Sequence, residues 1–188
     1  MVTRSRRERP LTRTELLDAA LGIVDSEGLE ALTMRRLADA VGVEAMSLYH
    51  HVPSKDALLD WTVERMRSEM RLPEPLPDGW AGVLEAIFVE YRRVLAAHPN
   101  MLPLAARRTD LAGASGLQYL IEQGIGPDDA VEMYQSLVAF TVGFSVLGSP
   151  LVETAWAGLP ATLAARLREL RDDTFRRTIR IVMDGYRS

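Results

Sequence analysis

Apolar side chains recur at helical spacing along most of the chain, with no strand pattern and no internal repeat. This pattern predicts an all-α protein. The first helix should begin after Thr12, which has the spacing of a capping box with Glu15, while Leu11 and Leu16 take the positions of a hydrophobic staple. Glu27-Gly28 should end this helix, because glycine is favoured just beyond a helix C-terminus.

Two short helices joined by a glycine are predicted next. Thr33 is a favourable N-cap for the first, and Gly42 ends it because a residue without Cβ turns the chain through positive φ at little cost. The second should run from about Ala45 to His51. Its expected inward side chains are Val43, Leu48 and Tyr49. Such a pair predicts a helix-turn-helix, whose second helix fits a DNA major groove, although ordinary helical bundles also contain this arrangement.

The side-chain composition of the second short helix favours DNA over plain solvent. A helix that only faces water usually carries pairs of lysine and glutamate. This helix instead presents small or hydrogen-bonding groups that suit bases and phosphates. These groups are Ala45, Ser47, Tyr49, His50 and His51. The composition therefore predicts a DNA-binding surface.

The segment LTMRRLADAVGVEAMSLYHHVPSKDALLD closely resembles the DNA-binding segment of TetR-family transcriptional repressors. Its GVE, SLY, HHV and K-ALLD pieces are especially similar to the tetracycline-repressor branch. The resemblance is dense over about Thr12 to Asp60 and looser through the rest of the chain. It implies an N-terminal three-helix helix-turn-helix domain that binds DNA and a C-terminal helical domain that binds a ligand and dimerises.

Ten residues are predicted to contact DNA. In the resembled family the arginine that matches Arg35 reads a base, so we favour Arg35 over Arg36. Lys55 follows the N-cap Ser54, where its ammonium group and the helix N-terminus can both face a phosphate. The full set is Thr33, Arg35, Glu44, Ala45, Met46, Ser47, Tyr49, His50, His51 and Lys55. Relatives often have proline in place of Met46 and an aromatic residue in place of His50, so their operators cannot be transferred to this chain.

A proline-rich stretch, Leu72 to Pro77, marks the expected domain boundary. Residues 1–53 form the predicted DNA-binding domain with its basic N-terminal arm. Residues 54–72 form a predicted connecting helix that ends near Arg71, and residues 73–188 form the ligand-binding and dimerisation domain. A helix that ends at such a break can tilt in response to changes in the domain behind it.

The second domain begins with a long amphipathic helix, which Asp78 should cap and His98-Pro99 should end. Met101 to Arg108 should form a short helix or an irregular turn. Asp110 should cap the next helix. The inward residues expected for that helix are Leu111, Leu117, Leu120 and Ile121.

The longest apolar helix is expected over Asp128 to Leu147, with apolar side chains around nearly its whole circumference. Such a helix is buried on all sides, so one side should meet a second subunit. Residues 161–170 should form another helix, and Asp172 or Asp173 should cap a last helix that reaches Tyr186. In the resembled family the two helices that match 128–147 and 173–186 pair across a twofold axis, which implies a homodimer.

Twelve residues of the second domain are candidates for a ligand pocket. Their mixture of aromatic, apolar and few polar side chains suits a binding site, but the same residues at helical spacing are also typical of an ordinary core. They are Phe88, Tyr91, His98, Leu102, Gln118, Met133, Tyr134, Gln135, Phe140, Thr141, Phe144 and Trp156. That a pocket exists is implied by the resemblance. Relatives that bind magnesium–tetracycline use a histidine that the stretch Asn100 to Arg108 lacks, so we expect a mostly apolar organic ligand.

Charge is distributed unevenly along the chain. The net charge is −4, but residues 1–14 hold five arginines and one glutamate, a net charge of +4, which leaves −8 for the rest. A basic arm on an acidic body is expected when one end of a protein meets nucleic acid. Arg4, Arg6, Arg7 and Arg9 can contact phosphates or a minor groove, or the arm can be a solubilising tail.

Other classes of protein are disfavoured. The absence of cysteine excludes disulfides and thiolate chemistry and fits a cytoplasmic protein. No signal peptide is recognisable, and the longest nearly apolar run, Leu137 to Gly148, is too short to span a bilayer. No metalloprotease, phosphate-loop or nucleophile motif is present, and the adjacent His50 and His51 would point about 100° apart on a helix. We therefore predict no enzyme, no cofactor, no metal site and no membrane partner.

The predicted function is that of a ligand-responsive repressor. A homodimer binds a palindromic operator in double-stranded DNA and is released from it by a mostly apolar small molecule. The alternative is a DNA-binding regulator, such as an activator, without small-molecule input.

Overall fold

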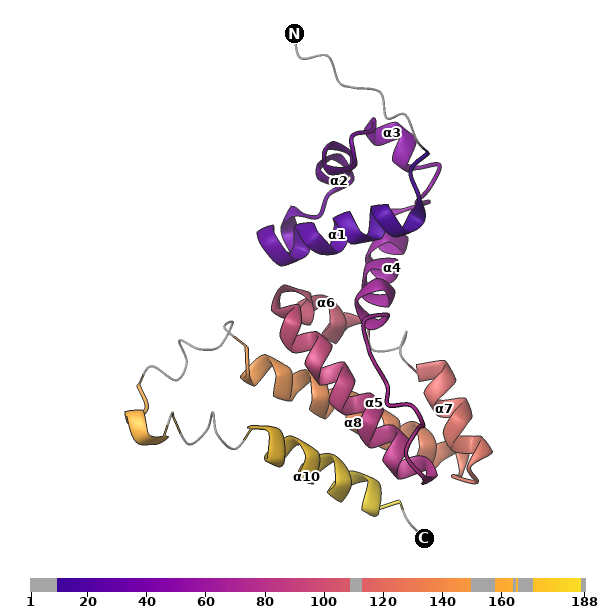
Figure 1. The fold of residues 1–188 in the computed structure, drawn as a ribbon, viewed down its shortest axis with the longest axis vertical. Coiled ribbons are helices and arrows are strands. Elements are labelled where there is room, and N and C mark those ends of the chain that lie inside the picture. The colour runs from indigo at the N-terminus through magenta and orange to yellow at the C-terminus, as the bar shows by residue number, and fades with distance from the viewer. Residues whose placement is uncertain (1–9, 109–112, 150–157, 164, 166–170, 187–188) are drawn as a thin grey trace. The chain divides into compact units, whose positions relative to one another are not determined.

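The computed structural model describes residues 10–108, 113–149, 158–163, 165 and 171–186, and all regular secondary structure in these residues is helical. The all-α fold class is therefore confirmed. Asp110, Leu111, Trp156 and the basic arm lie outside the described residues. The described elements with defined bounds, η marking a 3₁₀ helix, are α1 (Arg13–Glu27), η1 (Leu29–Ala31), α2 (Met34–Val41), α3 (Ala45–Leu48), α4 (Lys55–Arg67), α5 (Gly79–Ala97), η2 (Pro99–Met101), α6 (Leu102–Arg107), α7 (Gly113–Glu122), α8 (Pro127–Leu147) and α10 (Arg171–Asp184) (Figure 1).

The chain forms two compact units, Met1–Glu69 and Met70–Ser188. In the first unit α1 packs against α2 and α4, and α2 packs against α3. These helices enclose a core of fully buried leucine, valine and methionine side chains. The guanidinium carbon of Arg13 lies 4.0 Å from the ring centre of Trp61, which adds a polar tie between α1 and α4. By these contacts α4, the predicted connecting helix, belongs with the DNA-binding helices.

Three predicted N-caps in the first unit are confirmed. The Glu15 N–H donates to Thr12 Oγ1 at 3.2 Å, and the Thr12 N–H donates to Glu15 Oε2 at 3.0 Å, which completes the capping box. Thr33 accepts from the Arg36 N–H at 3.0 Å, and Ser54 accepts from the Ala57 N–H at 3.1 Å. Each cap satisfies a backbone donor that the helix itself leaves unpaired.

The helix-turn-helix forms as predicted, but its second helix is shorter. Gly42 has φ 72° and ψ 33°, so the turn between α2 and α3 is left-handed. α3 ends at Leu48 rather than near His51, and the chain continues in turns whose His51 and Val52 N–H groups both donate to the Leu48 carbonyl at 2.8 Å. Tyr49 does not face inward: it is 50% exposed, because the buried Val52 fills the interior position that we assigned to it.

α4 also ends earlier than predicted, at Arg67 rather than near Arg71. The Ser68 hydroxyl donates to the Arg65 carbonyl at 2.6 Å, and the Glu69 N–H donates to the Met66 carbonyl at 3.2 Å. These bonds close a tight turn, because serine readily bonds to nearby backbone groups and competes with helical hydrogen bonding.

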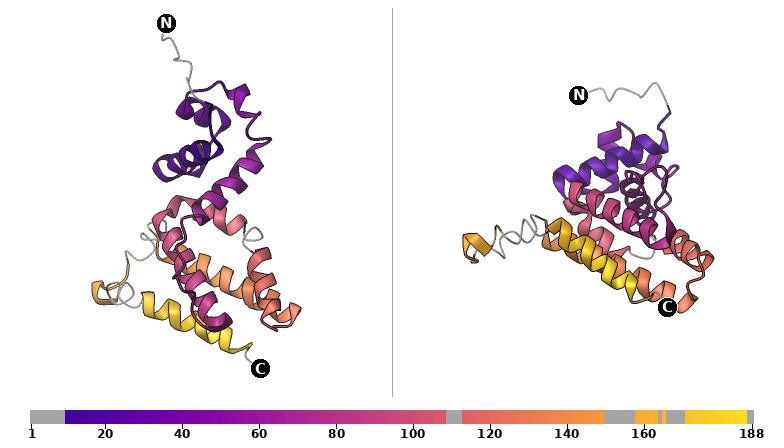
Figure 2. Two further views of the ribbon diagram at one scale, coloured as in Figure 1. Left: turned by 45° about the vertical axis from the view of Figure 1, so that its right-hand side comes forward. Right: turned by 60° about the horizontal axis from the view of Figure 1, so that its bottom comes forward.

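In the second unit α5, α8 and α10 pack against one another, and α6 and α7 pack against α8. Figure 2 shows α10 beside α5 and α8 from two further directions. Phe88 of α5 meets Tyr134 of α8 edge to face, with ring centres 5.5 Å apart. A Cβ at Gly116 of α7 would lie 2.5 Å from the Tyr134 ring, so glycine is what allows these two helices to approach this closely.

Three expectations for the second unit are corrected. Asp78 takes the N-cap position of α5, but its side chain makes no capping hydrogen bond. Ile121 is 40% exposed, because the fully buried Leu120 beside it takes the inward position and adjacent residues of a helix point about 100° apart. Asp172 and Asp173 lie within α10 rather than before it, so neither takes the N-cap position that we predicted for it.

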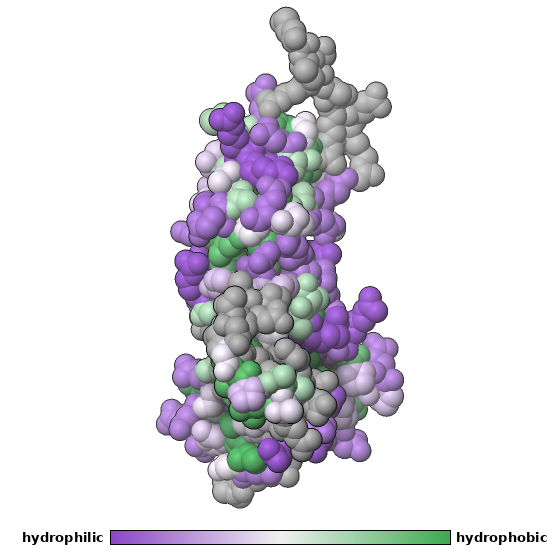
Figure 3. All heavy atoms as spheres, turned by 90° about the vertical axis from the view of Figure 1, so that its left-hand side faces the viewer, coloured by the Kyte–Doolittle hydropathy of each residue, from purple (hydrophilic) through white to green (hydrophobic). Residues whose placement is uncertain are grey.

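We predicted that α8 is apolar around nearly its whole circumference and buried on all sides, and this prediction is wrong for the isolated subunit. Its outward face carries small, polar and some apolar residues, namely Val131, Glu132, Gln135, Ser136, Ala139, Gly143 and Leu147. Figure 3 shows apolar side chains at the surface of the second unit. By length and composition α8 could cross a membrane, and no other described helix could. Its contacts with four helices of the same unit account for that composition.

A cluster of opposite charges joins α5 to α10. Glu85 accepts from Arg180 Nε at 2.8 Å, from Arg180 Nη2 at 2.7 Å and from Arg176 Nη1 at 3.1 Å. The hydrogen bonds from Arg180, more than those from Arg176, hold the pKa of the Glu85 carboxyl below its usual value, although burial opposes them.

This cluster predicts how stability depends on pH. Because the folded pKa of Glu85 is lowered, its contribution is present above about pH 4.5, the ordinary glutamate value, and is lost as pH falls toward the folded pKa. Glu85→Gln should lower the free energy of unfolding by about 0.5–1 kcal/mol at pH 7, since solvent screens the exposed arginines, and by less at pH 3.5. Urea unfolding followed by circular dichroism at one protein concentration measures both values. The exposed Glu74→Gln serves as the control, and an equal effect of Glu85→Gln at both pH values would contradict the assignment.

Candidate nucleic-acid interface

All ten residues predicted to contact DNA lie in the first unit and reach its surface. Nine are exposed and Ala45 is half-buried. Met46 at the start of α3 is 75% exposed, which is unusual for a large apolar side chain. Such exposure is expected where a side chain is reserved for contact with another molecule.

The local fold separates packing residues from outward residues. Leu48 and Val52 are fully buried and fix α3 against the rest of the first unit. Because α3 is only four residues long, its backbone also relies on the left-handed turn at Gly42 and on the turns after Leu48. The side chains between these anchors, from Glu44 to Ser47, are left to face outward or stay half-buried.

Arg35 and Arg36 differ sharply in their surroundings. Arg36 is held by Glu27 of α1: its Nε donates to both carboxylate oxygens at 3.1 Å, and its Nη2 lies 2.5 Å from Oε1. This hydrogen bonding holds the pKa of the Glu27 carboxyl below its usual value and raises the pKa of Arg36. Arg35 is exposed and makes no hydrogen bond or ion pair within the described part of the chain.

This difference gives the two arginines different roles. Arg36 ties α2 to the end of α1, so it orients the helix that precedes the turn. Arg35 keeps its five donors available, and a guanidinium group can bond bidentately to guanine or to a phosphate. The ion pair of Arg36 was not foreseen from the sequence, because Glu27 lies nine residues away and on another helix.

Lys55 occupies the first position of α4, directly after the cap formed by Ser54. It is exposed, and the N-terminal end of the helix adds partial positive charge beside its ammonium group. This arrangement suits a contact with a phosphate oxygen, and such a contact does not depend on the base sequence.

Lys55→Ala should therefore weaken binding to every DNA sequence alike. Loss of one phosphate contact is expected to reduce the slope of log affinity against log salt concentration by about 1. Fluorescence anisotropy measures this slope with a specific and a random DNA duplex. The salt concentration is varied from roughly 50 to 300 mM. An unchanged salt slope, or a loss confined to one sequence, would place Lys55 away from the DNA backbone.

The candidate ligand residues of the second unit separate into three groups. Phe88, Tyr91, His98, Leu102, Met133, Tyr134 and Thr141 are buried, Phe140 and Phe144 are half-buried, and Gln118 and Gln135 are exposed. Phe88 and Tyr134 lie together, as do Phe140 and Phe144 with ring centres 5.4 Å apart.

The polar candidates already have local partners or face outward. The Thr141 hydroxyl donates to the Leu137 carbonyl of its own helix at 2.7 Å, and Gln118 donates to Glu122 at 3.0 Å. Two cavities that described residues line run along α5 instead, and none of the twelve candidates lines either of them. A ligand contact by these residues stays a prediction.

Residues 16–60 match the family model of bacterial regulatory proteins, tetR family. An HTH-type transcriptional regulator of Saccharopolyspora erythraea is 34% identical over 90% of this chain and 74% of its own length. The class C tetracycline repressor protein of Escherichia coli is 29% identical over 93% of this chain and 90% of its own. The crystal structure of the Streptomyces coelicolor TetR family protein ActR in complex with actinorhodin has a TM-score of 0.72 at 29% identity, over 94% of this chain and 95% of that one. The chain therefore belongs to the TetR family of bacterial transcriptional regulators.

Proposed function

We propose that this protein is a homodimeric repressor that binds a palindromic operator and leaves it when a small organic molecule binds. The observation that carries the DNA-binding part is the outward face of the first unit, where Arg35 has no described partner while Arg36 is held by Glu27. Arg35, which has no described partner, can therefore bond to a base, whereas the Arg36 guanidinium group is held by Glu27. The side chains from Glu44 to Ser47, Tyr49, His50 and His51 would add base and phosphate contacts.

The outward faces of α8 and α10 support the dimer. On α8 this face carries the small residues Ser136, Ala139 and Gly143, which let a second helix approach closely, and Leu147 is 56% exposed at its end. On α10 Ile181 is 64% exposed. Apolar side chains this exposed fit a surface that a second copy covers. A dimer places its two helix-turn-helix units at half-sites that lie about 34–36 Å apart, which is one turn of DNA.

The ligand part rests on the family and on the composition of the second unit. The related ActR binds actinorhodin, and other relatives are tetracycline repressors. The aromatic pair Phe88 and Tyr134 gives an apolar environment, and the stretch Asn100–Arg108 offers no histidine for a metal-bound ligand. A mostly apolar organic molecule fits these residues best.

The mechanism links this ligand to DNA through the segment between α4 and α5. Ligand binding in the second unit changes the path of that segment. This change alters the separation of the two helix-turn-helix units in the dimer. Linkage requires that operator and ligand weaken each other's binding by the same factor.

Selection of bound sequences from a random DNA pool by the purified protein tests the proposal. We expect a palindrome whose half-sites lie about one turn apart. Enrichment of a single unpaired half-site would contradict the dimeric reader, and an operator complex that no hydrophobic compound dissociates would contradict ligand control.

A further inference from the structure

The chain between α4 and α5 is held on both sides of Met70. On the α4 side, Arg65 Nη1 of that helix donates to Glu69 Oε1 at 2.9 Å. On the α5 side, the Arg71 N–H donates to Glu90 Oε2 of that helix at 2.9 Å. Within the described part of the chain, a single residue therefore lies between an anchor on α4 and an anchor on α5.

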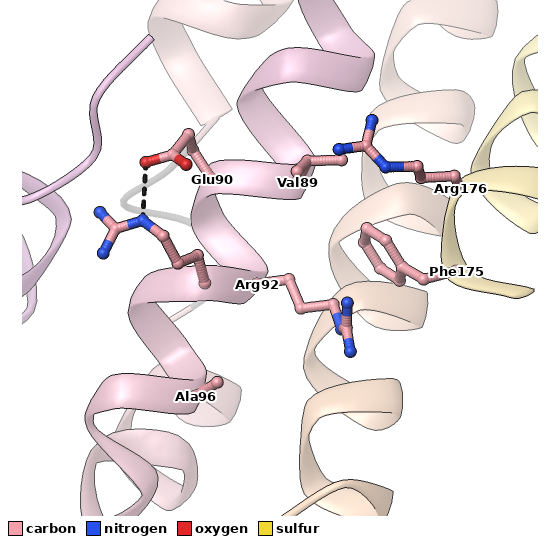
Figure 4. Close-up of a pocket in the computed structure, with 7 residues that line it drawn as sticks. Val89, Glu90, Arg92, Ala96, Phe175 and Arg176 are labelled. Atoms are coloured by element: carbon pink, nitrogen blue, oxygen red, sulfur yellow. Dashed lines mark hydrogen bonds and ion pairs between the residues drawn. The ribbon is translucent and has the colours of Figure 1, made fainter. Parts of the chain in front are cut away.

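The Glu90 carboxylate is well suited to hold this backbone group. Its side chain is 18% exposed, and it also accepts from Arg93 Nε at 2.9 Å (dashed line in Figure 4). The bond from the Arg71 N–H, more than the one from Arg93, holds the pKa of the Glu90 carboxyl below its usual value, although burial opposes both. The carboxylate is therefore ionised at neutral pH, so its hydrogen bond from Arg71 is charge-assisted and stronger than an ordinary backbone bond.

The rest of the segment is stiff and meets α5 again at its far end. Pro73, Pro75 and Pro77 restrict its backbone, and proline-rich chains behave as semi-rigid spacers. A Cβ at Gly82 of α5 would lie 2.9 Å from Pro77 Cβ, so the segment approaches the helix closely there. Between this contact and Arg71, a cavity of about 480 Å³ is lined by both the segment and α5. The contacts at the two ends therefore determine where the segment lies.

We propose that Glu90 positions the DNA-binding unit, because its bond to Arg71 limits the link between the two units to Met70. A link of one residue lets the Cα atoms of Glu69 and Arg71 lie at most about 7 Å apart. Without this bond the next close contact with α5 is at Pro77, eight residues beyond Glu69, which allows roughly 26–29 Å. The anchor therefore restricts how far the first unit can move. Its effect on DNA binding rests on the proposed homodimeric repressor, whereas the anchor itself does not.

In a dimer this restriction should favour operators with one particular spacing between half-sites. Once one helix-turn-helix unit has bound, the second meets its half-site at an effective concentration that is highest when the linker matches the required span. Release of Arg71 lowers that concentration at the optimal spacing but lets the dimer reach half-sites that lie closer together or farther apart. The contacts of each helix-turn-helix unit with its own half-site do not change. Loss of Glu90 should therefore reduce spacing selectivity, which a general loss of stability would not do.

Amide hydrogen exchange of Arg71, followed by NMR on the full chain without DNA, tests the anchor. Glu90→Ala removes the acceptor and should speed this exchange at least about tenfold, because hydrogen bonds to charged groups are strong. Alanine is a good helix former, so α5 should be retained, which circular dichroism verifies. Glu90→Gln keeps an oxygen that can accept from the Arg71 N–H and should speed the exchange less. An unchanged exchange rate in Glu90→Ala would overturn the anchor, whether or not an operator is found.

Operator duplexes with one base pair added to or removed from the spacer between half-sites test the effect on DNA binding. The wild-type protein should bind the altered duplexes at least about tenfold more weakly than the operator, whereas Glu90→Ala should bind all of them within about threefold. Glu85→Ala is the matched control and should keep the wild-type preference, because Glu85 is also a 17% exposed α5 carboxylate but pairs with arginines of α10. Sedimentation velocity verifies that each variant dimerises. Faster Arg71 exchange with unchanged spacing selectivity would overturn the positioning role of Glu90.

Discussion

Gly143→Arg is expected to leave the subunit folded and to abolish the dimer. A Cβ at Gly143 meets no atom within 4 Å, so the arginine points outward from α8 without disturbing its own subunit. Replacing a helical glycine also favours the helix by up to about 1 kcal/mol. In a dimer, however, two such arginines would meet near the twofold axis and keep the helices apart.

Loss of the dimer should lower operator affinity at least about a hundredfold, because specific complexes are typically a thousandfold or more tighter than nonspecific ones. Sedimentation velocity measures the dimer, and a DNA mobility shift measures the affinity. Gly22→Arg is the matched control, since Gly22 is also helical, exposed and open around its Cβ, but lies on α1 of the first unit. A Gly143→Arg protein that still sediments as a dimer would rule out this face of α8 as the interface.

Arg35→Ala is expected to weaken operator binding by about 1–3 kcal/mol and to relax specificity at one base pair of each half-site. The side chain has no described partner in the protein, so its removal should leave the free energy of unfolding almost unchanged. Arg36→Ala should instead lower the free energy of unfolding and leave base specificity unchanged, because it breaks the ion pair with Glu27. Comparing the two variants separates DNA contact from helix support.

Affinity measured against operators substituted at each position, together with urea unfolding, tests this contrast. Arg107→Ala on α6 removes the same charge from the second unit and serves as a further control. If Arg35→Ala changes stability but not base preference, Arg35 is a structural residue and the docking proposed for α2 is wrong.

The parts of the fold that local chemistry determines could be predicted from the sequence. Thr12, Thr33 and Ser54 cap their helices because the bond joins groups three residues apart. Gly42 and Gly28 end helices because they adopt positive φ, at 72° and 88°. The buried leucines of α1 and α2 followed from helical spacing. These features depend on residues within one turn of each other, so the sequence displays them directly.

The features that periodicity could not predict depend on distant residues or on very short helices. In a four-residue helix such as α3 no face is defined by repetition, so Tyr49 was assigned inward although Val52 fills that place. Glu85 meets Arg176 and Arg180 across 91 and 95 residues of chain. No local pattern of the sequence indicates the two cavities along α5.

The separation between buried anchors and outward residues on α3 has a consequence for evolution and for engineering. Because Leu48 and Val52 hold the helix in place from inside, the residues Glu44 to Ser47 can be exchanged with little effect on folding. A duplicated copy of the gene could acquire a new genomic target through a few substitutions while it keeps the proposed ligand control. The same exchange would let a laboratory assemble several sensors on this scaffold, each answering one compound at its own promoter.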